Sequence, residues 1–242
     1  MISTGLVSAA DAAARLVDLS AEISGCTACR LSETRTNAVP GDGPVTARIM
    51  AVGEAPGETE DQTGRPFVGA AGRLLTRLLQ GIGLDRHDIF ICNVLKCRPP
   101  SNRDPLPDEV DACARFLDAQ VALIRPDVIL LLGRHALGRL LPGRPPISRI
   151  HGDRVVDGDR VYVPLYHPAA ALYNGGMLAT LEADMVRVRG YLEDAVAARA
   201  AEAGTAAAGT ATAPTAGTEE ASPDVVDGDR GQLDLFAGPP PA

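Results

Sequence analysis

Residues 53–61 read Gly53-Glu54-Ala55-Pro56-Gly57-Glu58-Thr59-Glu60-Asp61, and residues 64–69 read Gly64-Arg65-Pro66-Phe67-Val68-Gly69. An apolar run at 48–52 precedes them and predicts a short buried strand, while apolar residues spaced from Leu74 to Ile82 predict a helix after them. In an open α/β sheet, ligands bind at the carboxyl ends of parallel strands, where the chain turns. This glycine-rich turn, with its carboxylates, therefore predicts a ligand site.

Phe67 is an unusual residue in so polar a turn. The chain has only four Phe, four Tyr and no Trp. An aromatic ring beside several glycines suits stacking on a flat ligand, but it also suits a plug that fastens the turn to the core. This segment alone leaves both interpretations open.

The rest of the chain alternates predicted strands and helices. Strands are expected near 48–52, 88–94, 127–132 and 160–165, and helices near 8–23, 69–82, 107–124, 134–141 and 178–194. This alternation predicts a parallel sheet with helices on both faces. The carboxyl ends of the strands, which gather at one sheet edge, present Glu54, Asn93, Gly133 and His167.

Composition divides the chain into three parts. Residues 1–195 can form one sizeable core. Residues 196–231 are rich in Ala, Gly, Thr and Pro and predict a disordered linker, because they cannot bury enough apolar surface to offset their ordering entropy. Residues 232–242 form a short tail.

Charge follows the same division. The net charge is −8, but residues 201–242 hold seven acids and one base, so the other 200 residues carry only −2. Several bases lie close in sequence to the glycine-rich turn and to Cys97, which leaves polyanion binding open. The start of the chain lacks the features of a signal peptide, and no apolar run is long enough to span a bilayer. We therefore expect a cytoplasmic protein without membrane contact.

Four of the five cysteines suggest a metal site. Cys26 and Cys29 form a CxxC pair, Cys97 lies in a loop, and Cys113 falls in a predicted helix. In a reducing compartment such a pair indicates a metal clamp or a redox pair rather than a structural disulfide. Spacing alone does not separate zinc from an iron–sulfur cluster. Cys92, within a strand, is expected to be a buried apolar filler.

Two polar residues at strand ends have chemistry of their own. Asn93 presents a donor and an acceptor in one plane, which suits the edge of a pyrimidine, although a strand-end cap is the simpler interpretation. His167 is held between a strand and Pro168 and is a candidate donor to a developing anion, while a lone histidine is often structural.

Several segments, taken together and in order, resemble the family-4 uracil-DNA glycosylases, which carry an iron–sulfur cluster. They are GEAPGETED at 53–61, GRPFVG at 64–69, NVLKCRPP at 93–100, LPDE at 106–109 and His167-Pro168. The resemblance extends from about Cys26 to Tyr191. It implies a three-layer α/β/α sandwich with a central, mainly parallel four-stranded sheet. It also implies a 4Fe–4S cluster bound by Cys26, Cys29, Cys97 and Cys113.

The resemblance further implies an enzyme that removes uracil from single- or double-stranded DNA and leaves an abasic site. The base must leave the stack and enter a pocket. Phe67 would stack on it, Asn93 would pair with its edge and reject cytosine, and Glu60 would exclude the methyl group of thymine. We expect the enzyme to act as a monomer.

The catalytic residues implied by the resemblance are Glu54, His167 and Asn93. His167 would donate to uracil O2 as negative charge builds, and Glu54, with the backbone of Gly53 and Ala55, would position the attacking water. Leu172 would fill the gap left by the extruded base.

Two features depart from the family pattern. Ala169 stands where serine is usual and Tyr173 where a basic residue is common, which puts the DNA contacts in doubt. A related branch traps its DNA product through a histidine in an Arg-Ile-His stretch within an inserted loop. Here Arg149-Ile150-His151 lies elsewhere in the chain, without that insertion, so we do not expect covalent trapping.

The tail contains Gln232-Leu233-Asp234-Leu235-Phe236. The pentapeptide resembles the short motif with which bacterial repair and replication proteins bind the sliding clamp, and we assign that role to Gln232, Leu233, Leu235 and Phe236. The alternative is a chance apolar cluster. For the whole chain, two competing hypotheses are a non-enzymatic, four-cysteine nucleic-acid-binding module and a superfamily glycosylase of different base specificity.

Overall fold

The computed structural model describes residues 8–158 and 160–209. Backbone contacts divide the chain into a compact unit, Met1–Ala203, and a second unit, Gly204–Ala242. The site described below lies entirely in the first unit. None of the described helices is both long enough and apolar enough to cross a membrane.

A five-stranded sheet forms the centre of the compact unit, with strand order β2-β1-β3-β5-β4. The strands are β1 (Ile49–Gly53), β2 (Phe90–Asn93), β3 (Val128–Leu132), β4 (Val155–Asp157) and β5 (Arg160–Leu165). All neighbours pair in parallel except β4, which runs antiparallel to β5 at the edge. The four long strands confirm the predicted parallel sheet.

The expectation of four strands is wrong, because it omits β4. This strand has three residues, in a polar stretch without the alternation or apolar run that predicts a strand. It lies at the sheet edge and is partly exposed, so its pairing with β5 does not require an apolar sequence.

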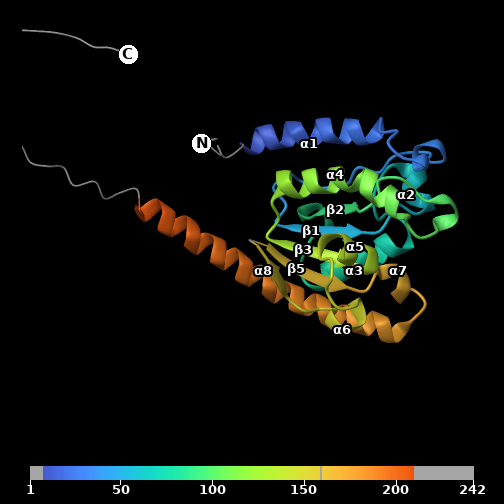
Figure 1. Cartoon of the computed structure of the whole chain (residues 1–242). Coiled ribbons are helices and arrows are strands. Elements are labelled where there is room, and N and C mark those ends of the chain that lie inside the picture. The colour runs from blue at the N-terminus through green and yellow to red at the C-terminus, as the bar shows by residue number, and fades with distance from the viewer. Residues whose placement is uncertain (1–7, 159, 210–242) are drawn as a thin grey trace, which may run out of the picture. The chain divides into compact units, whose positions relative to one another are not determined.

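Helices cover both faces of the sheet (Figure 1). The longer helices are α1 (Ala9–Ser24), α3 (Ala70–Gly81), α4 (Pro107–Ile124), α5 (Arg134–Leu140) and α8 (Gly175–Gly209). The short ones are α2 (Glu58–Thr63), α6 (Ile147–Ile150) and α7 (Pro168–Ala171), with 3₁₀ turns at Arg30–Glu33, Arg86–Asp88 and Pro100–Asn102.

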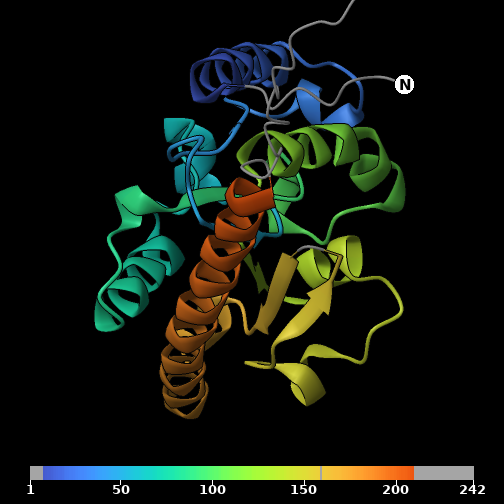
Figure 2. The ribbon, with the colours of Figure 1, turned by 90° about the vertical axis from the view of Figure 1, so that its left-hand side faces the viewer.

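Successive residues of β1 point to two different cores. Ile49 and Ala51 pack with α3 and α8, and Met50 and Val52 pack with α4 and α5. On the first face α3 and α8 lie side by side (Figures 1 and 2). On the second face α1 packs outside α4 and shares with it a third, smaller core. The three layers predicted from the resemblance are therefore confirmed.

Helix α8 is longer than the sequence predicts. It continues to Gly209, so residues 196–209, which we expected to begin a disordered linker, are helical. Eight of these 14 residues are Ala, the best helix former, and a helix already started at Gly175 needs no new nucleation to continue. The rest of the predicted linker and the tail at 232–242 lie outside the described residues.

Candidate active site

The carboxyl ends of the parallel strands bring the predicted polar residues to one edge of the sheet. Gly53 of β1 is in register with Asn93 of β2, and the backbone N–H of Gly133 donates to the carbonyl of Leu165 at 2.9 Å. Glu54 directly follows β1, and His167 follows β5 by two residues. Register therefore brings together residues that are far apart in sequence.

A cavity of about 280 Å³ opens at this edge. Its lining includes six of the residues that the sequence singled out: Glu54, Ala55, Glu60, Phe67, Asn93 and His167. The other lining residues, to which the sequence assigned no role in the pocket, are Pro56, Gly57, Ala71, Pro99, Asn102, Arg103 and Ala169.

Phe67 is held in the cavity wall by an unusual backbone. Its φ of 51° is in the left-handed region, which bulky residues avoid, yet the residue is only 5% exposed. Arg86 fixes this conformation by donating to the carbonyls of Phe67 and Pro66 at 2.9 and 2.6 Å. Nothing in the sequence marks Arg86 for this role.

Two glycines make room for this arrangement. A Cβ on Gly72, in α3, would lie 1.8 Å from the carbonyl oxygen of Phe67. A Cβ on Gly53 would lie 2.5 Å from the Phe67 ring and 2.4 Å from Asn93 Oδ1. Gly53 therefore lies against the cavity wall and allows Phe67 and Asn93 to meet. A glycine inside a helical pattern, such as Gly72, is a sequence signal for close approach.

Asn93 is 1% exposed, and its Oδ1 is buried without a hydrogen-bond partner. No other buried side-chain nitrogen or oxygen of the described residues lacks one. Its backbone carbonyl accepts from Lys96 Nζ at 2.7 Å, and Lys96 also donates to Gln120 Oε1 at 2.6 Å. A rigidly supported amide whose oxygen has no partner is suited to accept a hydrogen bond from a ligand.

His167 is a neutral hydrogen-bond donor. Burial lowers its pKa to about 4, an effect that the nearby Glu60 opposes. Nδ1 accepts from the backbone N–H of Ala169 at 3.1 Å, so the single proton of the neutral ring is on Nε2. The ring lies 5.6 Å from that of Phe67, centroid to centroid.

The carboxylate of Glu60 holds the turn that carries Phe67. Its Oε1 accepts from the backbone N–H groups of Val68 at 2.9 Å and Gly69 at 2.7 Å, where α3 begins. A negative charge is favourable at a helix N-terminus. Glu60 thus contributes both to the shape of the cavity and to its negative charge.

Glu54 is the second carboxylate of the cavity, and its side chain is partly buried. Burial raises its pKa, and the nearby Asp104 adds to this, while His135 and Arg134 oppose it. His135, at the start of α5, places Nε2 3.6 Å from Glu54 Oε2. No pattern in the sequence marks His135 for a role at this site.

The cavity therefore combines four chemical features. The aromatic ring of Phe67 forms one wall, and the amide of Asn93 presents an oxygen that has no hydrogen-bond partner. A neutral imidazole, that of His167, can donate a hydrogen bond. The carboxylate of Glu54 can hold a water molecule. Such a set fits a flat heterocycle that has a polar edge and gains negative charge during reaction.

The four predicted ligand cysteines line a second, much smaller cavity, between α1 and α4. Arg35 Nη1 lies 3.1 Å from Cys97 Sγ, and the backbone N–H of Lys96 lies 3.3 Å from Cys113 Sγ. Burial raises the pKa of Cys97, and the nearby Arg35 opposes this rise. Burial also raises the pKa of Cys113, to about 11, and here Lys96 opposes the rise. Cationic and N–H donors directed at sulfur suit thiolates that bind metal. Cys92 is buried in β2, as expected of a filler.

Some predicted residues lie outside the main cavity. Leu172 is partly buried against the core, whereas the adjacent Tyr173 is 94% exposed. His151 does not line the cavity; its Nδ1 lies 2.8 Å from Asp184 Oδ2 and its ring packs against Tyr166. The motif at 232–236 lies outside the described residues.

Comparison with known proteins agrees with this geometry. The family model described as "Uracil DNA glycosylase superfamily" matches residues 40–189. A type-4 uracil-DNA glycosylase of Sulfurisphaera tokodaii is 48% identical over 177 residues, covering 69% of this chain and 80% of that protein. One from Thermotoga maritima is 49% identical over 159 residues, covering 64% and 82%. One from Archaeoglobus fulgidus is 46% identical over 182 residues, covering 72% and 91%.

Proposed function

This chain belongs to the uracil-DNA glycosylase superfamily, and from that premise we infer that it is a DNA repair enzyme that removes uracil from DNA. The reaction hydrolyses the N-glycosidic bond of deoxyuridine and leaves an abasic site. The observation that best supports it is the buried, unpartnered Oδ1 of Asn93 in the wall of a cavity that also holds Phe67 and His167.

Base recognition follows from these residues. The extruded base stacks on Phe67, and the N–H of uracil N3 satisfies the unpaired Oδ1 of Asn93. Cytosine has no proton at N3, so it would leave that oxygen without a partner at a cost of about 1–3 kcal/mol. Glu60, held by Val68 and Gly69, is the residue that we expect to exclude the thymine methyl group.

Bond cleavage leaves negative charge on the departing uracil. His167 Nε2–H donates to O2 as that charge develops, and the neutral state of the ring means that no ionised donor has to be buried. Glu54, with the backbone of Gly53 and Ala55, positions the water that attacks the sugar. The carboxylate form of Glu54 accepts a hydrogen bond from that water more strongly than the protonated acid would.

We propose that a side chain of the Leu172–Tyr173 turn enters the DNA duplex and fills the space left by the extruded uracil. Leu172 was the residue expected from the resemblance, and Tyr173 is the side chain that reaches solvent. Replacing each with Ala in turn, and measuring fluorescence of a 2-aminopurine placed beside the uracil, will show which side chain enters the duplex.

We also propose that Cys26, Cys29, Cys97 and Cys113 bind a 4Fe–4S cluster. All four line one cavity, with cationic and N–H donors directed at their sulfurs. The resemblance to the family-4 glycosylases, which carry an iron–sulfur cluster, favours the cluster over a single zinc ion. Zinc without iron in purified protein would contradict this assignment.

We propose that the enzyme acts as a monomer on DNA. We further propose that Gln232, Leu233, Leu235 and Phe236 bind a sliding clamp. Deleting 232–236 should abolish clamp capture and leave excision from short oligonucleotides unchanged. Retained capture would refute the clamp proposal.

The main test uses a labelled oligonucleotide with one uracil, incubated with protein and then cleaved at abasic sites with alkali. Matched oligonucleotides with thymine, cytosine or hypoxanthine in place of uracil test base specificity. We expect strand breaks with uracil, and at least 100-fold slower excision by Asn93→Ala. No breaks with folded, iron-loaded wild-type protein would reject the proposed function, and faster excision of hypoxanthine would change the substrate.

A further inference from the structure

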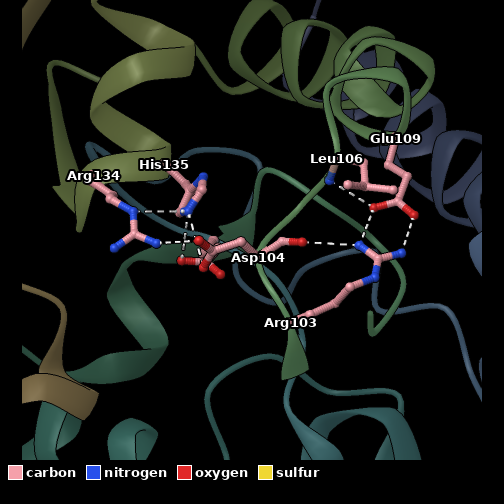
Figure 3. Close-up of polar contacts among 7 residues, drawn as sticks. Arg103, Asp104, Leu106, Glu109, Arg134 and His135 are labelled. Carbon is pink, nitrogen blue, oxygen red and sulfur yellow. Dashed lines mark hydrogen bonds and ion pairs between the residues drawn. The ribbon is translucent and has the colours of Figure 1, made fainter. Parts of the chain in front are cut away.

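Four charged side chains from three separate segments meet beside the cavity. Glu54 follows β1, Asp104 lies in the loop before α4, and Arg134 and His135 begin α5. Figure 3 shows Arg134 and His135 converging on Asp104. Ligand-type oxygen and nitrogen atoms of Glu54, Asp104 and His135 lie within 4.8 Å of one another, so two carboxylates approach one imidazole.

His135 Nε2 is at the centre of this group. It lies 3.6 Å from both Glu54 Oε2 and Asp104 Oδ1. Arg134 Nε approaches the same nitrogen at 3.2 Å, and Arg134 Nη2 lies 2.5 Å from Asp104 Oδ2. When the ring is protonated it forms ion pairs with the two carboxylates, and when Nε2 carries no proton it can accept a hydrogen bond from Arg134 Nε. His135 therefore has a polar neighbour in either state.

Asp104 is held in place from two directions. Arg134 fixes its carboxylate. The preceding residue, Arg103, donates to the carbonyl of Asp104 at 3.0 Å and to Glu109, whose side chain is fully buried, at 2.5 and 2.9 Å (Figure 3). Because Arg103 also lines the cavity, the same loop builds the cavity wall and presents Asp104 to His135.

We propose that His135 is a positioning residue for Glu54: it fixes the carboxylate that faces the cavity, while Asp104 and Arg134 fix His135. This inference rests on the proposed function of the cavity, in which Glu54 holds the attacking water. His135 does not line the cavity and so acts through Glu54 rather than on the substrate.

The charges around Glu54 give the proposal a directional test. The groups acting on Glu54 are His135 and Arg134 from α5 and Asp104 from the loop, and Glu60, Arg103 and His167 line the same cavity. Arg134, and His135 when its ring is protonated, favour the carboxylate and oppose the pKa rise that burial causes, whereas negative Asp104 adds to that rise. Removing His135 or Arg134 should therefore raise the pKa of Glu54, and removing Asp104 should lower it.

The experiment compares single-turnover uracil excision across pH in wild type, His135→Gln, Arg134→Gln and Asp104→Asn. For His135→Gln we expect the maximal single-turnover rate to be about tenfold lower at neutral pH, with the half-saturating enzyme concentration unchanged, because a displaced carboxylate misaligns the water and not the base. The acid limb of the rate–pH profile is the range in which the rate falls as Glu54 becomes protonated. It should move to higher pH in His135→Gln and Arg134→Gln, and to lower pH in Asp104→Asn. His87→Gln, an exposed histidine that does not line the cavity, should match wild type.

Opposite shifts separate positioning from loss of structure, since damaged folding would not move the limb in opposite directions. A limb that stays fixed in His135→Gln, or moves the same way in His135→Gln and Asp104→Asn, would overturn the proposal. ¹³C NMR titration of the Glu54 carboxyl group, identified with Glu54→Gln, provides a readout without substrate. If wild type excises no uracil but the NMR shifts have the expected signs, the proposed function fails and the arrangement around Glu54 stands.

Discussion

Individual residues of the cavity are held in states that an isolated chain would avoid. Phe67 has a left-handed backbone, Asn93 has a buried oxygen without a partner, and His167 is neutral because burial disfavours the charged ring. Strained or unsatisfied groups of this kind persist where the surrounding structure fixes them, and they concentrate at functional sites. Arg86 and Lys96 provide that support through backbone carbonyls.

The neutral state of His167 gives a prediction about pH. Because burial lowers its pKa to about 4, the ring keeps the same donor proton from pH 8 down to pH 5. We expect His167→Ala to excise uracil about 100- to 1000-fold more slowly. The ratio of wild-type to His167→Ala single-turnover rates should stay constant between pH 5 and 8. A ratio that increases as the pH falls through 6–7 would show instead that an imidazolium is the active form.

Asn93 gives a prediction about stability. Asn93→Ala removes a buried acceptor that has no partner in the free protein, so the free energy of unfolding should stay within about 1 kcal/mol of wild type or increase. Excision should fall at least 100-fold. Val94→Ala, at the next buried position, is the control and should lose about 2 kcal/mol through the cavity it creates. Chemical denaturation measures both, and a large loss of stability in Asn93→Ala would indicate a structural amide.

At the scale of elements, the parts that sequence predicts are those with a helical apolar period or a continuous apolar run. The helix at Ala70–Gly81 and the strand at Val128–Leu132 both follow from such patterns. Strand β4 and helix α7 are too short to establish a period. The extension of α8 was missed because a composition that cannot form a core can still propagate a helix.

The same distinction applies to the site. Residues that follow predicted strands, such as Asn93 and His167, were predictable because parallel strands end at one edge. Arg86 and His135 were not, since their roles depend on contacts between segments 19–20 and 81 residues apart that no local pattern encodes. Gly72 was predictable only in part. A glycine inside a helix indicates that another segment approaches closely, but the sequence does not show that this segment is the backbone of Phe67.

Helix α3 gives a prediction at this scale, because two of its glycines differ in surroundings. In Gly72→Ala the new Cβ would meet the carbonyl of Phe67, so we expect a loss of about 1–3 kcal/mol in unfolding free energy and slower excision as Phe67 is displaced. In Gly81→Ala no atom lies within 4 Å, and stability should rise by about 0.5–1 kcal/mol. Thermal unfolding and excision assays test the pair. Equal effects at both positions would show that helix propensity, rather than the contact with Phe67, decides the outcome.

At the scale of the whole molecule, charge is distributed unevenly along the chain. The first 200 residues are close to neutral, and most of the net charge of −8 comes from the acids beyond residue 200. A repair enzyme must approach a polyanion, and like charges repel it over roughly a Debye length, about 10 Å at 0.1 M salt. Acids in the C-terminal part of the sequence should therefore slow association with DNA without altering the cavity.

The effect of these acids on DNA association can be tested in the full-length chain by neutralising five of them and leaving the motif at 232–236 intact. The variant carries Glu219→Gln, Glu220→Gln, Asp224→Asn, Asp227→Asn and Asp229→Asn, which changes the formal net charge from −8 to −3. Fluorescence anisotropy with a labelled, uracil-free oligonucleotide should show about threefold tighter binding at low salt, and this gain should vanish at high salt as the charges are screened. Excision rates at saturating DNA should match wild type, because no cavity residue is changed. Equal affinities at low salt would mean that these acids do not act on DNA, and a gain that persists at high salt would point to a direct contact rather than long-range repulsion.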